Sequence, residues 1–161
     1  MNAEDFRHFY EYHFSENRKL WDHDIASLSQ EQFTQPSSYS QGSVRNQIVH
    51  LMNVDNAWFS DLRGGQNAPE LDPPDTSDRT IIRAFGDAVE AGMRDYLAGL
   101  SDEMLSGKPL QGEDANLVLW QILLHVANHA TDHRAQLLRQ INDFGVKTGP
   151  QDYVFYLYDH P

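Results

Sequence analysis

The sequence contains no cysteine, few basic residues and no long apolar run. The absence of cysteine from 161 residues excludes disulfides, thiolate metal sites, cysteine nucleophiles and iron–sulfur clusters. The 12 basic residues stand against 24 acidic ones, so the net charge of −12 repels nucleic-acid phosphates, and we expect no nucleic-acid partner. No stretch approaches the ~18 apolar residues of a membrane span, and the first residues lack the pattern of a signal peptide. We therefore expect a cytoplasmic protein with no membrane partner.

The composition is that of a globular chain, with 40% apolar and 22% charged residues. Its length suits a single domain over residues 1–161. Apolar residues recur at spacings of three and four, which predicts four long amphipathic helices over residues 2–29, 43–63, 77–100 and 114–144. Such a set in one small domain indicates an all-α four-helix bundle.

The segments between these helices carry their own signals. The second helix is expected to begin at an N-cap, Ser43, and the third near Thr76 or Ser77. Residues 64–77 are rich in proline and glycine, and this loop is long enough to cross to the far side of the bundle. Residues 30–42 read as a loop, and a short extended piece is expected around residues 104–110. The aromatic tail after Pro150 is expected to form a short helix.

Three of the eight histidines lie close together on the last long helix, at His125, His129 and His133. Side chains four residues apart share one helical face, so two of these imidazoles can bind one metal ion. All three cannot, because His125 and His133 lie ~12 Å apart along the helix axis. A helical wheel places His129 and His133 at the edge of the apolar arc and His125 on the polar face, which favours the first two as the inward pair.

A third ligand has to come from another helix. His13 is a candidate because it lies within the apolar stripe of the first helix. The wheel turns His50 away from the stripe of the second helix, so periodicity alone predicts a surface residue there. A partly buried, hydrogen-bonded histidine pair without metal is the competing interpretation.

Two longer stretches and the tail resemble the DinB-like superfamily, which is named for DNA-damage-inducible proteins. The second helix reads His50-Leu-Met-Asn-Val-Asp-Asn-Ala-Trp58, and the fourth reads Asn128-His129-Ala-Thr-Asp132-His133-Arg-Ala-Gln136. The resemblance covers nearly the whole chain. It implies an up-down-down-up bundle with a long crossover between the second and third helices.

The resemblance also implies a divalent metal, zinc or nickel first, bound by His50, His129 and His133. Two positions depart from the family pattern, since Asp132 replaces a histidine and Ala135 replaces a glycine, but neither change removes a ligand. Further residues could orient the ligands or line the cleft, although ordinary packing or capping would also explain them: His13, Asn17, Asn53, Trp58, His125, Asn128, Asp132 and Gln136.

Three imidazoles leave coordination positions open, and imidazole also suits iron and copper. The first hypothesis is a transferase in which the metal activates a low-molecular-weight thiol for attack on an electrophilic substrate, as the resemblance to thiol-dependent relatives implies. The second is a hydrolase that uses metal-activated water, with Asp132 or Asp55 as candidate bases. The third is a helical dimer with a structural or vestigial metal and no catalysis.

A homodimer is expected from the resemblance. It is also expected from aromatic residues predicted to be exposed, namely Phe9, Tyr12, Tyr156 and Tyr158.

Overall fold

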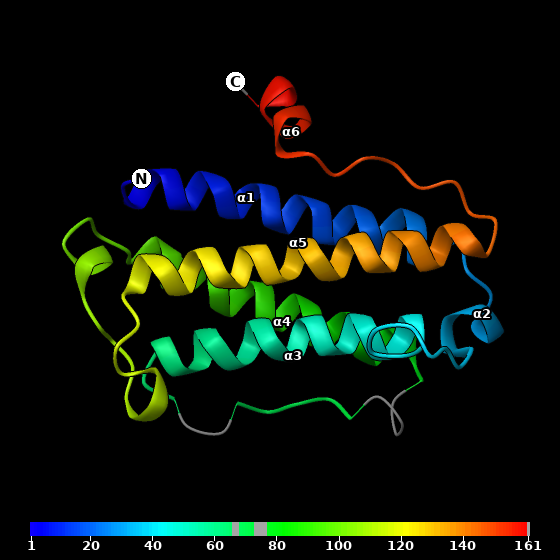
Figure 1. Cartoon of the computed structure of the whole chain (residues 1–161), viewed down its shortest axis with the longest axis horizontal. Helices are drawn as coiled ribbons and strands as arrows, with labels where there is room; N and C mark the ends of the chain where they lie inside the picture. The colour runs from blue at the N-terminus through cyan, green and yellow to red at the C-terminus, as the bar shows by residue number, and fades with distance from the viewer. Residues whose placement is uncertain (66–67, 73–76, 161) are drawn as a thin grey trace.

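The structure, a computed structural model, describes residues 1–65, 68–72 and 77–160 and is all-α over that part of the chain (Figure 1). The described residues form no strand and six α-helices: α1 Ala3–Lys19, α2 Gln30–Thr34, α3 Val44–Leu62, α4 Arg79–Ala98, α5 Leu119–Asp143 and α6 Tyr153–Asp159. The all-α prediction is confirmed. Over the same residues, no helix combines the length and the apolar character that crossing a membrane requires.

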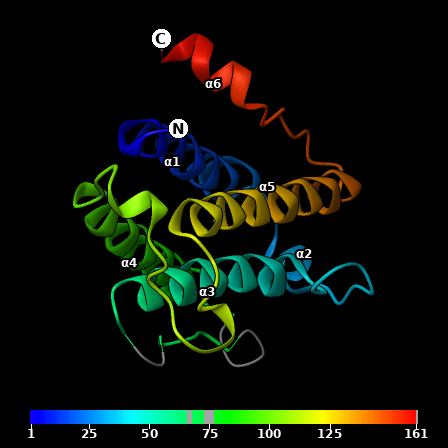
Figure 2. The same ribbon diagram turned by 60° about the vertical axis from the view of Figure 1, so that its left-hand side comes forward.

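Four long helices lie lengthwise against one another. α3 packs between α4 and α5, and α1 contacts both α4 and α5. Figure 1 shows α1 and α5 running in one direction and α3 and α4 in the other. Residues 66–67 and 73–76 of the segment that joins α3 to α4 lie outside the described residues, so the predicted crossover is described only in part. Figure 2 shows α6 standing outside α1 at the end of an extended segment.

Helix boundaries follow local capping chemistry. Ser43 caps α3 as predicted, since its side chain accepts a hydrogen bond from the main-chain nitrogen of Asn46. Asp78 caps α4 in the same way, and Thr76 lies outside the described residues. Gln121 caps the main-chain nitrogen of Val118, so α5 begins at Leu119 and not at the expected residue 114.

Three further expectations are corrected. The first helix does not continue to residue 29, because α1 passes into a π-helical segment, Leu20–Ile25. The expected loop over residues 30–42 contains α2, which Ser29 and Gln32 cap reciprocally. The expected extended piece is a 3₁₀ turn at Met104–Ser106, because main-chain hydrogen bonds between residues three apart close it. The short helix predicted after Pro150 is present as α6.

Two apolar clusters form the core, one at each end of the long helices. The first contains Phe6, Phe14, Phe59 and Leu123, among others, and the second is built from residues such as Leu20, Ile48, Ile82 and Leu137. α1, α3 and α5 also bury polar side chains, which form a polar layer: His13, Glu16, Gln47, Asp55, His133 and Arg134. This polar layer positions the candidate site.

The tail helix covers aromatic residues that the sequence places on the surface. Tyr12 and Tyr156 are buried, and Phe9 is partly covered, whereas Tyr158 is 72% exposed. Tyr153 and Tyr156 of α6 pack against the rings of α1, and the Tyr12 hydroxyl donates to the main-chain oxygen of Gln151. The expectation of exposure is therefore wrong for Tyr12 and Tyr156, and dimerisation stays a prediction.

Candidate metal centre

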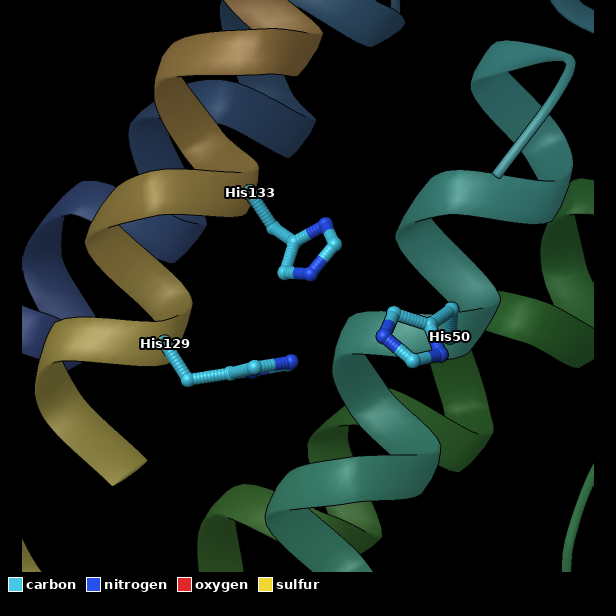
Figure 3. A group of neighbouring side chains, drawn as sticks. All are labelled: His50, His129 and His133. Atoms are coloured by element: carbon cyan, nitrogen blue, oxygen red, sulfur yellow. The ribbon is translucent and has the colours of Figure 1, made fainter. Parts of the chain in front are cut away.

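Three histidines from two helices come together at the α3–α5 interface (Figure 3). His50 comes from α3, and His129 and His133 come from α5, and one ring nitrogen of each lies within 4.8 Å of the others. The ring centroids are 4.4 Å apart for His129 and His133, 4.7 Å for His50 and His133, and 5.3 Å for His50 and His129. In Figure 3 each ring turns the nitrogen farther from its main chain, Nε2, toward the space between the three side chains.

The helix pairing explains why His50 joins this group. α3 and α5 run in opposite directions, with contacts from Gly42–Gln140 at one end to Trp58–His125 at the other. The helical wheel treats α3 as having one apolar stripe, but α3 packs on both α4 and α5. On such a wheel, a residue that faces α5 therefore falls outside the single stripe even though it is packed against a helix. The expectation that His50 is a surface residue is wrong, because it is only partly exposed and faces α5.

The environment of His129 and His50 favours neutral imidazole. Burial, followed by the proximity of the His133 and His50 rings, lowers the pKa of His129 to about 4, against the opposing effect of the Asp55 carboxylate. Burial, followed by the proximity of His133, also lowers the pKa of His50. Neutral imidazole is the form that binds a metal ion. Three imidazole rings with converging Nε2 atoms fit a divalent cation of the imidazole-binding group.

The other ring nitrogens of two of these histidines lack partners. His129 Nδ1 and His133 Nδ1 are both buried, and neither has a hydrogen-bond partner among the described residues. Buried polar atoms of this kind are uncommon, and they call for an explanation at a candidate site.

A buried network lies on the inner side of the site. His13 Nε2 is 3.3 Å from Asp55 Oδ2, and Arg134 Nη1 lies 3.5 Å from His13 Nδ1. Arg134 also donates to Asn17 Oδ1 at 3.0 Å, and Asn17 Nδ2 lies 3.2 Å from His13 Nε2. Further donation from Arg134 to Gln151, at 2.8 Å, ties the network to the segment that leads to α6. His13 and Asn17 thus belong to this network and do not join the three histidines.

Two predicted cleft residues flank the site. The rings of Trp58 and His125 meet edge to face with centroids 5.2 Å apart, and the His125 ring lies 6.1 Å from that of His129. His125 is exposed, so this aromatic pair forms an outer wall beside the three histidines.

The remaining predicted residues make contacts elsewhere. Asp132 is exposed and accepts a hydrogen bond from Gln136, which also contacts Ser40. Asn53 binds the main chain of Leu71 through both its oxygen and its nitrogen. Asn128 lines a groove of about 640 Å³ between α5 and the tail, together with Tyr12 and Tyr153. None of these side chains is hydrogen-bonded to a ligand histidine.

Two buried residues beside the site were missed by sequence reasoning. Gln47 is fully buried one turn before His50, and its Nε2 donates to the main-chain oxygen of His133 at 3.4 Å. Arg134 is 1% exposed at the centre of the polar network. The sequence feature that could have identified them is a polar residue inside an apolar helical stripe. Such a residue is rarely buried unless its polar atoms have partners.

Comparison with known proteins adds a family. The model described as the DinB family matches residues 1–160. A search of curated proteins finds no match for the chain.

Proposed function

The chain belongs to the DinB family, and from this premise we propose that it binds a divalent metal, zinc or nickel, through His50, His129 and His133. We propose further that it is a transferase that activates a low-molecular-weight thiol for attack on an electrophilic substrate. The observation that carries both proposals is the convergence of three imidazoles from α3 and α5. We also propose that the four long helices form an up-down-down-up bundle.

A bound cation at this position would favour the thiolate form of a thiol, which is the nucleophile. The chain's own contribution is to hold three ring nitrogens in place and to leave the remaining coordination positions to the substrate. Transfer requires the thiol to lose its proton to solvent. The sulfur then forms a bond to the electrophilic carbon, and the leaving group departs with the electron pair of the broken bond. The Trp58–His125 pair offers an aromatic wall against which an apolar part of the electrophile can lie.

The placement of the two candidate bases favours this proposal over hydrolysis. A carboxylate beside the site would assist hydrolysis by taking a proton from the attacking water. Asp55 is 2% exposed and directs one oxygen at His13, and Asp132 is hydrogen-bonded to Gln136 on the outside of α5. Thiol attack depends less on such a base, because a free thiol, with a pKa of about 8.5, is already far more acidic than water before either binds a cation.

The experiment uses tag-free protein loaded with Co²⁺, titrated with glutathione while the sulfur-to-cobalt charge-transfer absorption is followed. We expect a saturable band in the wild type and in His125→Ala, and no band in His50→Ala. No band with glutathione or with free cysteine contradicts the thiol proposal. Ester turnover without added thiol would instead support the hydrolase. A metal-dependent rise in melting temperature without either activity would support a structural role.

A further inference from the structure

The starting observation is the pair of buried ring nitrogens that lack partners. His129 Nδ1 and His133 Nδ1 both lie on the side of the ring away from the converging Nε2 atoms. An imidazole that binds metal through Nε2 carries its proton on Nδ1, and this N–H nearly always donates to a carboxylate, a carbonyl or water. Each of these two ligands therefore needs an acceptor inside the protein.

α3 carries two buried acceptor atoms that also lack partners among the described residues, Gln47 Oε1 and Asp55 Oδ1. Both side chains are almost completely buried, with exposures of 0% for Gln47 and 2% for Asp55. Gln47 precedes His50 on the helix and contacts His133. Asp55 follows His50 on the same helix.

The Gln47 amide already lies against His133. Its Nε2 donates to the main-chain oxygen of His133 at 3.4 Å, and its Oε1 is free. One amide can donate to the main chain of a residue and accept from the ring of the same residue, because its two polar atoms are bonded to one carbon. Gln47 can thus engage His133 at both points after a side-chain adjustment that brings Oε1 to the ring, since the structure contains only the main-chain contact.

The Asp55 carboxylate is oriented by the polar network. One oxygen, Oδ2, lies 3.3 Å from His13 Nε2, and Arg134 holds His13 from the other side. The other oxygen is left free within the same buried layer. Asp55 also acts electrostatically on His129, where it opposes the effect of burial.

We propose that Gln47 and Asp55 are positioning residues for the metal centre. Gln47 Oε1 accepts a hydrogen bond from His133 Nδ1–H, and Asp55 Oδ1 accepts one from His129 Nδ1–H. These two hydrogen bonds give partners to four buried polar atoms at once. This inference rests on the proposed function, since it assigns roles toward the metal that the three histidines bind.

The first test needs no substitution. Long-range ¹H–¹⁵N spectra of the zinc-loaded wild type identify which ring nitrogen carries the proton and how fast that proton exchanges. We expect His129 and His133 to show slowly exchanging Nδ1–H signals and metal at Nε2. Metal at Nδ1, or Nδ1 protons that exchange as fast as those of exposed histidines, would overturn the inference.

The second test uses matched glutamines. Gln47→Met removes the acceptor at nearly constant size, and we expect zinc affinity to fall 10–100-fold with loss of the protected His133 signal. Gln140→Met is the control, because Gln140 is also buried with a free Oε1, but it binds the main chain of Gly42. Asp55→Asn, which keeps the shape of the side chain, is expected to weaken zinc binding and to change the His129 signal while the His133 signal stays as in the wild type.

Equal zinc affinity and unchanged imidazole spectra in Gln47→Met and Gln140→Met would overturn the role of Gln47. An unchanged His129 signal in Asp55→Asn would overturn that of Asp55. Both results leave the proposed function standing if the wild type binds zinc. A wild type that binds no zinc overturns the proposed function and this inference together, so the two failures are distinguishable.

Discussion

His50 and His133 face each other across the α3–α5 interface, with ring centroids 4.7 Å apart and ring planes at 63°. His50 belongs to α3, and His129 and His133 belong to α5, so the three-histidine group exists only when the two helices are packed together. A ligand that binds this group and not the unfolded chain must stabilise the fold by mass action.

Zinc is therefore expected to raise the melting temperature. At a free concentration of 100 times Kd the stabilisation is about 2.7 kcal/mol. For a chain of this size this corresponds to a shift of roughly 5–10 °C. Calorimetry with and without zinc measures the shift, which should persist in His125→Ala and disappear in His50→Ala. A shift of equal size in both variants would show that zinc acts at another place.

Acid should destabilise the metal-free protein in a defined window. The pKa of His129 is about 4 in the folded state, against about 6.5 in an unfolded chain. The unfolded chain therefore takes up this proton first as the pH falls. The stability that the neutral ring contributes is complete above pH 6.5 and is lost progressively down to about pH 4.

Urea unfolding at pH 7, 5.5 and 4.5 measures this loss. A His129→Gln variant keeps a polar side chain that does not titrate, so its stability should fall less over the same range. Parallel pH profiles for the wild type and His129→Gln would contradict the lowered pKa.

Arg134 is expected to be a major contributor to stability. Its guanidinium is buried and donates to Asn17, Thr131 and Gln151, so truncation leaves several buried polar groups without partners. Arg134→Met should lower the free energy of unfolding by roughly 3 kcal/mol. Arg139→Met serves as the control on the same helix, since Arg139 is exposed and pairs with the exposed Asp143. Similar melting temperatures for the two variants would argue against the polar network as a structural element.

Local features of this fold could be predicted from the sequence, and features set by tertiary packing could not. The Ser43 cap and the shared face of His129 and His133 depend on residues within one or two turns of a helix. α2 and the turn at Met104–Ser106 are too short to show a periodicity.

The grouping of His50 with the other two histidines depends on how α3 faces two neighbours at once, which a wheel for an isolated helix does not contain. The family resemblance supplied that residue where periodicity did not. Gln47 could not be assigned for a related reason, because its contact with His133 exists only across the helix interface. The burial of Tyr12 likewise depends on where the tail returns to α1.

The central claim is that His50, His129 and His133 together bind one metal ion. It is tested most directly by counting bound metal with mass spectrometry on tag-free protein purified without chelators, beside His50→Ala and the control His125→Ala. The account predicts close to one equivalent of zinc or nickel in the wild type and in His125→Ala, and almost none in His50→Ala. Metal retained in full by His50→Ala, or absent from all three proteins after reconstitution with zinc and nickel, would contradict it.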